Sequence, residues 1–187
     1  YINLVEKNVE ELTYVREFEN NGWQSLYLPF GFTITEEMAA EFEFAYIYNA
    51  SYKNKETRID FVEVGAGFEL AANYPYMIRA KEAGSKSIVV ENAKLMPTEV
   101  KTIDCSSVFE TFSFIGNYST IEESDLEAGK GHFKMNEGNW ERMYDLNPFR
   151  FYIQIANRDG SEFEYPNNSE AKFIRMRSVG ENGEVPG

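Results

Sequence analysis

The chain is poor in the residues that most often carry chemistry, because its 187 residues include one cysteine and one histidine. A single cysteine, Cys105, allows no internal disulfide and no multi-cysteine metal site. It has no basic neighbour in sequence that would activate its thiol, so we expect a small residue near a strand end. His132 stands in no nucleophile motif, and we expect a surface or structural role for it. We therefore assign no catalytic residue, no metal and no cofactor.

Positive charge is also scarce. The chain has 18 lysines and arginines against 31 aspartates and glutamates, which gives a net charge of −13. Such a negative field repels phosphate backbones and anionic bilayers, so we expect no nucleic-acid partner. No apolar run approaches the roughly 18 residues of a membrane span, and none is predicted. The chain starts at Tyr1 without a methionine or an apolar signal region, which is typical of a mature or trimmed product.

Aromatic residues, by contrast, are abundant at 16% of the chain, and many of them alternate with other residues. In residues 42–48 (FEFAYIY) the aromatic side chains fall on alternate positions and would share one face of a strand. Residues 149–155 (FRFYIQI) repeat the pattern with phenylalanine and isoleucine. Further strand-like runs lie at residues 12–18, 57–64, 67–72, 76–80, 87–90 and 111–115. About a dozen short strands of this kind predict an all-β fold.

Two turn sequences predict hairpins. Residues 157–160 (NRDG) contain an Asp-Gly pair, which tolerates the positive φ of a tight turn. Residues 136–139 (NEGN) have similar turn chemistry. The predicted hairpins pair residues 149–156 with residues 161–165, and residues 132–135 with residues 140–144.

One short helix is predicted at residues 35–40. Thr33 and Glu36 have the spacing of a capping box, and the residues that follow are mostly good helix formers. No linker-like segment interrupts the interior of the chain. The sequence therefore predicts one domain over residues 1–179, an antiparallel β-sandwich of jelly-roll or Greek-key type, with a loose polar tail at residues 180–187.

The stretch NGWQSLYLPF, residues 21–30, concentrates large side chains in one short strand. Alternation would place Trp23 and Tyr27 on one face, with leucines on the other. Because neither face is wholly polar, we expect this strand to pack on both sides. That expectation places it inside the sandwich rather than at its rim.

Three aromatic residues are the candidates for a sugar-binding platform: Trp23, Trp140 and Tyr152. Exposed aromatic rings supply large flat contact areas with a polar handle. A sandwich of this size also needs many large side chains inside it, and burial is favoured for most aromatic residues here. Two roles therefore remain open for these residues, one in a sugar-binding platform and the other in the hydrophobic core.

Carboxylates offer another route to sugar chemistry, because a glycosidase needs two of them placed across a sugar ring. Most acidic residues here alternate with aromatic ones, as Glu41 and Glu43 do, which is typical of a solvated strand face. Hydrolysis by a carboxylate pair is therefore the less favoured alternative.

Three stretches, taken in order, resemble one known kind of module. They are residues 23–30 (WQSLYLPF), residues 70–79 (LAANYPYMIR) and residues 146–152 (LNPFRFY). Together they resemble a β-rich module of surface proteins from Bacteroides-type gut bacteria, usually described as cell-adhesion proteins. That module is often found beside leucine-rich-repeat or bacterial immunoglobulin-like segments. The resemblance spans about residues 10–155, and this chain shows no leucine-rich repeats.

The resemblance implies an exported, non-enzymatic module at the cell surface or in the periplasm. Its function would be adhesin-like binding of a host or bacterial surface protein or glycan. Two alternatives stay open. One is a carbohydrate-binding or carbohydrate-cleaving domain that uses an aromatic platform and carboxylates. The other is a pilus-type assembly subunit, which needs a donor strand or an open groove. The resemblance supplies no ligand residues.

We expect a framework role without any ligand for all three stretches, and elementary chemistry supports it at residues 74–79 and 148–153. In each, a proline precedes an aromatic residue that opens a strand, a position that suits a residue without an N–H donor. Arg79 and Arg150 follow these prolines closely. In so acidic a chain, we expect each guanidinium to bind a carboxylate or the carbonyls at a strand end.

Overall fold

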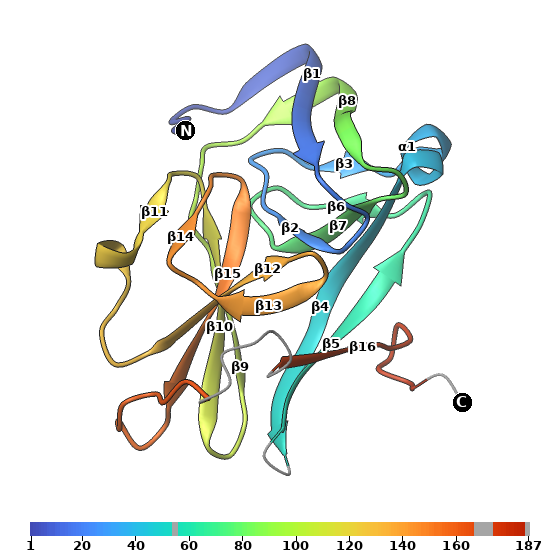
Figure 1. The fold of residues 1–187 in the computed structure, drawn as a ribbon. Helices are drawn as coiled ribbons and strands as arrows, with labels where there is room; N and C mark the ends of the chain where they lie inside the picture. Colours follow the sequence, from blue (N-terminus) through green and yellow to red (C-terminus); the bar gives the residue numbers. More distant parts are fainter. Residues whose placement is uncertain (54–55, 167–173, 186–187) are drawn as a thin grey trace.

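The computed structural model describes residues 1–53, 56–166 and 174–185, and strands dominate it. Two five-stranded sheets pack against each other, and a two-stranded ribbon with the single α-helix lies over one end of them (Figure 1). The predicted all-β, sandwich-like fold with one short helix is confirmed. None of the helical segments in these residues has the length and apolar character of a membrane span.

The first five-stranded sheet, here the central sheet, has its strands in the order β16-β5-β4-β7-β2. These are β16 (Ile174–Ser178), β5 (Glu56–Val64), β4 (Phe42–Lys53), β7 (Tyr76–Ala80) and β2 (Gln24–Leu26). Its pairs are antiparallel except β16 with β5, which is parallel. The expectation of a wholly antiparallel sandwich is therefore wrong at this edge. Because β5 and β16 lie far apart in the chain, no hairpin turn fixes their relative direction.

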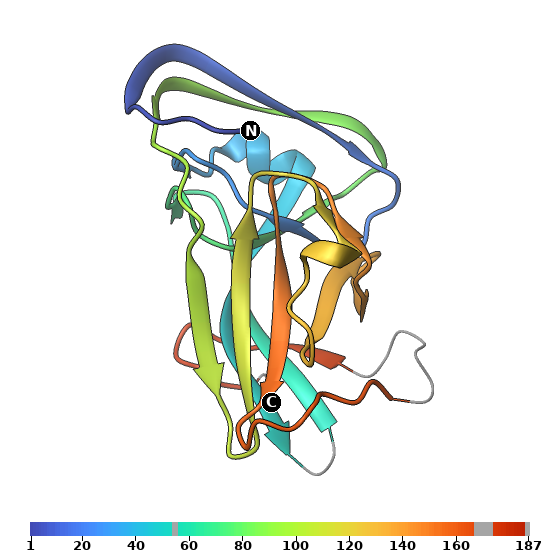
Figure 2. The same ribbon diagram turned by 90° about the vertical axis from the view of Figure 1, so that its left-hand side faces the viewer.

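The second five-stranded sheet, here the facing sheet, is antiparallel throughout. In order, its strands are β13 (Asn139–Arg142), β12 (Gly131–Asn136), β15 (Arg150–Asn157), β10 (Glu110–Asn117) and β9 (Thr102–Ser106). Figure 2 shows β10 and β15 running side by side down the length of this sheet.

The long two-stranded ribbon crosses the top of the molecule in Figure 2, and the other remaining elements are short. The long ribbon consists of β1 (Lys7–Phe18) and β8 (Gly84–Leu95), paired antiparallel. The smaller elements are α1 (Glu36–Glu41), the pair β3 (Phe32–Thr33) and β6 (Glu69–Leu70), the pair β11 (Ile121–Glu122) and β14 (Asp145–Leu146), and a 3-10 turn at Glu123–Asp125.

Two hydrophobic cores, one on each face of the central sheet, hold the layers together. The first core lies between the sheets and joins side chains such as Tyr27 and Met77 to Phe114 and Phe151. The second core joins the other face of the central sheet to the ribbon and α1; its members include Phe18, Met38, Phe44, Ile78 and Ile88. The part of the central sheet formed by β2, β7 and β4 is therefore buried on both faces, so hydrophobic side chains on each face leave water.

This double burial explains the stretch NGWQSLYLPF. Trp23 and Tyr27 belong to the first core, and Leu26 and Leu28 belong to the second, so the predicted packing on both sides is confirmed. In the pairing order, however, β2 is an edge strand, and the prediction that it lies away from the rim is wrong. The edge stays buried because the facing sheet reaches over it, where the Tyr27 N–H donates to the Phe149 carbonyl at 3.0 Å.

The three stretches that carry the resemblance meet at one place in the fold. Besides the bond from Tyr27 to Phe149, the Asn73 N–H donates to the Leu28 carbonyl at 2.7 Å. Asn73 is buried with a φ of 54°, and its side-chain oxygen accepts a bond of 2.6 Å from the Tyr118 hydroxyl. Asparagine is one of the few residues that tolerate this left-handed conformation. These buried, mutually bonded residues form the framework that the sequence predicted.

Arg79 and Arg150 both donate to oxygen acceptors, as predicted. The Arg79 Nε donates to Glu43 Oε2 at 2.8 Å, and its Nη2 lies 3.6 Å from Glu63 Oε1. The Arg150 Nη1 donates to the Pro148 carbonyl at 2.7 Å, where β15 begins. The first arginine thus links neighbouring strands, and the second binds the chain just before its own strand.

The predicted hairpin at residues 136–139 is confirmed. β12 and β13 pair up to Asn136 and Asn139, which leaves a loop of two residues. Glu137 has a φ of 52° and Gly138 has a φ of 79°. Two successive left-handed residues are the mark of a type I′ turn, whose twist matches that of the paired strands.

The other predicted hairpin is wrong, because residues 161–165 form no strand. β15 already pairs with β10 on one side and β12 on the other, so it has no open edge for a third partner. The segment crosses over β12 instead. There the Phe163 N–H donates to the Gly129 carbonyl at 2.8 Å, and the Tyr165 hydroxyl accepts a bond of 2.7 Å from the His132 N–H.

The predicted helix is present at Glu36–Glu41, but its first turn is capped by a different residue. Thr35 is the N-cap, and its hydroxyl accepts a bond of 3.1 Å from the Met38 N–H. The predicted capping box began two residues earlier, at Thr33, which pairs with Glu69 in the β3–β6 sheet. The strand pairing occupies Thr33 and leaves the capping position to Thr35.

The last described residues follow the edge of the central sheet. The Val179 N–H donates to the Phe61 carbonyl at 2.8 Å. Beyond it, the Gly180 N–H donates to the Glu184 carbonyl at 2.7 Å, which closes a turn. The predicted tail ends at residues 186–187, which lie outside the described residues, and its looseness stays a prediction.

Candidate functional site

Both candidate tryptophans lie in the first core. Trp23 is 7% exposed and Trp140 is 2% exposed. The Trp23 ring meets Phe61 edge-on, with centroids 5.6 Å apart, and the Arg79 guanidinium covers it at 4.5 Å from the centroid. The Trp140 ring packs against Phe151 with centroids 5.9 Å apart. A buried indole offers no free face to a sugar, so both residues act here as core and not as platform.

The third candidate, Tyr152, lies on the other face of the facing sheet. It alternates with the fully buried Phe151 and Ile153 along β15 and is itself half-buried. Its ring lies 6.2 Å from the His132 ring, and burial raises the pKa of the Tyr152 hydroxyl. The fold therefore does not assemble Trp23, Trp140 and Tyr152 into one surface.

The lone histidine and the lone cysteine both occupy structural positions. His132 is 3% exposed, and its Nε2 lies 3.0 Å from Gln154 Oε1. Burial lowers the pKa of His132, while the bond to Gln154 opposes that lowering. Cys105 stands next to the last residue of β9, as expected, and burial raises the pKa of its thiol. Among the described residues, no group of three or more histidine, cysteine, aspartate and glutamate side chains is placed to hold a metal ion.

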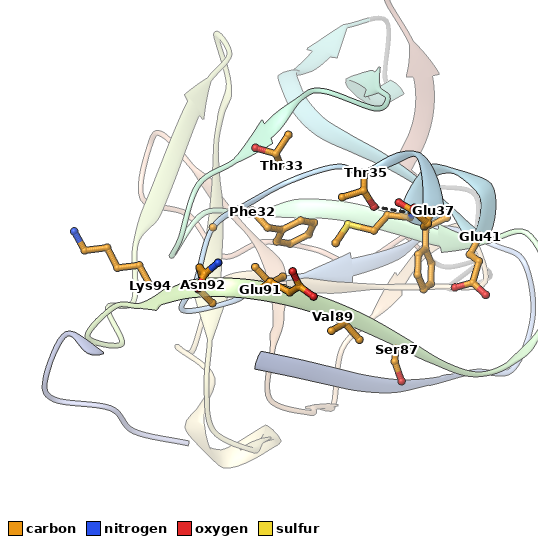
Figure 3. Close-up of a pocket in the computed structure, with 15 residues that line it drawn as sticks. Phe32, Thr33, Thr35, Glu37, Glu41, Ser87, Val89, Glu91, Asn92 and Lys94 are labelled. Carbon is orange, nitrogen blue, oxygen red and sulfur yellow. Dashed lines mark hydrogen bonds between the residues drawn. The ribbon is translucent and has the colours of Figure 1, made fainter. Parts of the chain in front are cut away.

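A hollow of about 810 Å³ lies between β8 and the segment that carries β3 and α1, and we call it the β8 groove (Figure 3). Its floor is apolar and consists of the buried side chains of Phe32, Met38 and Phe42. Val89, which is 45% exposed, belongs to the β8 wall. Figure 3 shows Phe32 between β8 and the helix, so the groove opens directly above the second core.

The rim of the β8 groove is acidic. Glu37 and Glu41 come from α1, and Glu91 comes from β8. Within the part of the chain that the structure describes, none of the three carboxylates forms an ion pair. Lys94, the one cation among the described lining residues, pairs with Glu6 at 3.4 Å. The rim therefore carries uncompensated negative charge that attracts cationic groups.

β8 presents an open strand edge along this groove. Its backbone pairs with β1 on one side. For residues 87–94, no backbone hydrogen bond joins the other side of β8 to any described segment. Pairing resumes at Leu95, which forms a bridge with Phe30. An open edge offers a row of N–H and C=O groups to an added strand.

Sequence patterns predict the elements that line this groove, but they do not predict that these elements lie together and form a groove. The helix and a strand at residues 87–90 are both predicted, and the hydrophobic alternation that predicts them is local. Nothing in either pattern says which elements become neighbours, because residues 36–41 and 87–94 meet only through packing on the central sheet. The acidic residues Glu37, in the predicted helix segment, and Glu41, directly after it, are a local signal for this surface.

Comparison of the chain with models of protein families, with curated proteins and with solved structures gives no match.

Proposed function

We propose that the protein is a non-enzymatic, adhesin-like binding module, exported to the cell surface or periplasm, and that it holds an extended segment of a partner protein in the β8 groove. One observation carries this proposal: an open strand edge runs beside an apolar floor and an acidic rim. Strand addition to such an edge supplies affinity through backbone hydrogen bonds, and pockets for alternate side chains supply specificity.

The occupant is a segment with alternating apolar and basic side chains. In a strand, successive side chains point to opposite sides, so apolar residues can meet Phe32 and Met38 while basic residues stay near the rim. Glu37, Glu41 and Glu91 supply the complementary charge. The exported location rests on the resemblance of the three sequence stretches, and cell fractionation of the source organism tests it.

The binding proposal is tested with a fluorescently labelled eight-residue peptide of alternating valine and lysine, followed by fluorescence anisotropy. Its matched control is the same peptide with glutamate in place of lysine. We expect the basic peptide to bind, the acidic peptide not to bind, and the affinity to fall as salt is raised, because salt screens the rim charges. A triple variant, Glu37→Gln with Glu41→Gln and Glu91→Gln, should bind at least tenfold more weakly.

A second triple variant removes the same charge from elsewhere. Glu123, Glu164 and Glu181 are exposed and line no part of the groove, so their replacement by glutamine should change the affinity less than twofold. Equal weakening by both triple variants would show a non-specific charge effect and contradict the groove. Binding that appears only on a glycan array favours a carbohydrate-binding module. Self-association that the groove variant abolishes favours an assembly subunit.

A further inference from the structure

A second hollow, of about 340 Å³, shares no lining residue with the β8 groove. It forms where β1 and β2 meet the chain around β12, β14 and β15. Two arginines from distant parts of the sequence, Arg16 and Arg150, both line it. We call this hollow the arginine cavity.

The two arginines are unusual in how deeply they lie. Arg16 is 6% exposed, and it is the one cation among the buried residues of the described chain. Its Nη1 donates to the Ser25 carbonyl at 2.7 Å, and its guanidinium carbon lies 5.5 Å from the centroid of the Phe18 ring. Arg150 is half-buried and donates to the Pro148 carbonyl at 2.7 Å. Each guanidinium has five N–H donors, and the bonds to these carbonyls and from Arg16 to the Tyr14 side chain use a minority of them.

Neither arginine has an acidic partner. Among the described residues, no carboxylate forms an ion pair with Arg16 or Arg150. Several of the more exposed arginines of the same chain do have such partners: Arg79 binds Glu43, and Arg175 binds Glu56 at 3.3 Å. Buried charges are normally paired, because leaving water is costly for an isolated ion. Although the chain has 31 acidic residues, its most buried cation, Arg16, has no ion-pair partner among the described residues.

The surroundings make this arrangement electrostatically unfavourable in the absence of a ligand. Burial, together with the charge of Arg16, lowers the pKa of Arg150 to about 10. Burial also lowers the pKa of Arg16, which only the neighbouring Tyr14 hydroxyl opposes. Asp145, which also lines the cavity, forms an ion pair with Lys134 at 2.6 Å. Glu17 and Glu19, the other two acids of the lining, are exposed and form no ion pair with either arginine. The two mutually repelling cations therefore have no directly bonded counter-charge among the described residues.

We propose that the arginine cavity binds the carboxylate oxyanion of an acidic sugar, with Arg16 and Arg150 bound to it. Planar guanidinium groups match such oxyanions in both geometry and charge. The amides of Gln24 and Asn147 also line the cavity and form no side-chain hydrogen bond within the described chain. Amides can both donate and accept, which suits sugar hydroxyls. This site does not depend on the β8 groove.

The test measures thermal unfolding of the full chain with increasing glucuronate, galacturonate, glucose and sodium sulfate at constant ionic strength. A ligand that binds only the folded state raises the unfolding temperature as its concentration exceeds its dissociation constant. We expect the two uronates to raise it and glucose to leave it unchanged. A rise with sulfate alone would assign the cavity to a free inorganic anion and overturn the sugar. No rise with any of the anions would overturn the site.

Substitutions of Arg150, with a control substitution at Arg175, test whether uronate binds in the arginine cavity. Arg150→Gln removes a half-buried cation and should weaken uronate binding at least tenfold, and Arg150→Lys, which keeps the charge but loses the planar fork, should weaken it less. Arg175→Gln, an exposed change on β16, should bind uronate as the wild type does. An unchanged response in Arg150→Gln would overturn the proposal.

A spectroscopic readout keeps the proposal testable for Arg16, whose replacement could prevent folding. In ¹⁵N-resolved spectra of the wild type, the Nε–Hε signals of Arg16 and Arg150 should shift together as uronate is added. Shifts confined to Arg158 and Arg175, which lie outside the cavity, would contradict it.

Discussion

At the scale of single residues, Tyr27 shows how tightly the first core is fixed. Its ring is fully buried, its hydroxyl donates to the Glu99 carbonyl at 2.7 Å, and it accepts a bond of 2.9 Å from the Lys101 N–H. A Cβ added at Gly116 would stand 2.0 Å from Cζ of this ring. The hydroxyl bonds leave the ring no room to move aside, because a shift would break both of them.

Gly116→Ala should therefore destabilise the protein. Overpacking a tight core costs about 1–3 kcal/mol or more, and here the backbone of β10 must also shift. Chemical denaturation followed by far-UV circular dichroism measures the loss. Gly65→Ala is the matched control, because nothing lies within 4 Å of the added Cβ. A Gly116 variant as stable as the Gly65 variant would show that Tyr27 is mobile.

At the scale of elements, α1 depends on the capping position that the β3–β6 pairing leaves free. The Thr35 hydroxyl satisfies one of the N–H groups that the first turn of any helix leaves without a partner. The position matters for function as well, because Glu37 and Glu41 on this helix form part of the groove rim. Loss of the cap would loosen the helix and disperse these carboxylates.

Thr35→Ala should lower the free energy of unfolding by about 1 kcal/mol, the usual contribution of a threonine cap. Thr33→Ala, which removes the hydroxyl of the residue favoured by the sequence pattern, should stay within about 0.5 kcal/mol of the wild type. Urea denaturation of both variants at one pH distinguishes them. If Thr33→Ala were less stable than Thr35→Ala, Thr33 and not Thr35 would be the capping residue.

The elements also show what sequence patterns can predict here. Alternation of aromatic and polar residues is a local property, so it locates β4, β7 and β15 well. Pairing is a non-local property. Residues 161–165 have a strand-like sequence after a good turn, yet β15 has both edges filled and cannot accept them. The arginine cavity escaped prediction for the same reason, since Arg16 and Arg150 come together only when the ribbon lies over the sheets.

At the scale of the whole molecule, the central sheet belongs to both cores, so the cores should not unfold separately. Ile153 lies in the first core and Ile78 in the second, and both are fully buried. Ile153→Val and Ile78→Val should each lower stability by about 0.5–1.5 kcal/mol. Because both tryptophans report on the first core, Ile78→Val tests whether the second core is coupled to them.

We expect one cooperative transition, with coincident midpoints by tryptophan fluorescence and far-UV circular dichroism for the wild type and both variants. Ile78→Val should shift the fluorescence midpoint as far as Ile153→Val does, when the shifts are scaled by their stability losses. A fluorescence midpoint that Ile78→Val leaves unchanged would mean that the ribbon and α1 form an independent unit.

The parallel strand β16 has a consequence for how copies of the protein behave toward one another. It occupies the edge of β5, where Thr57, Ile59 and Phe61 alternate in a strand that would otherwise end the sheet. Exposed strand edges of this length are templates for aggregation, and proteins commonly cover them. By pairing along this edge, β16, the last described strand, replaces the nine-residue edge of β5 with a five-residue edge of its own, and a short edge is a poorer template for pairing between molecules. The edge of β8, by contrast, stays open beside its acidic groove.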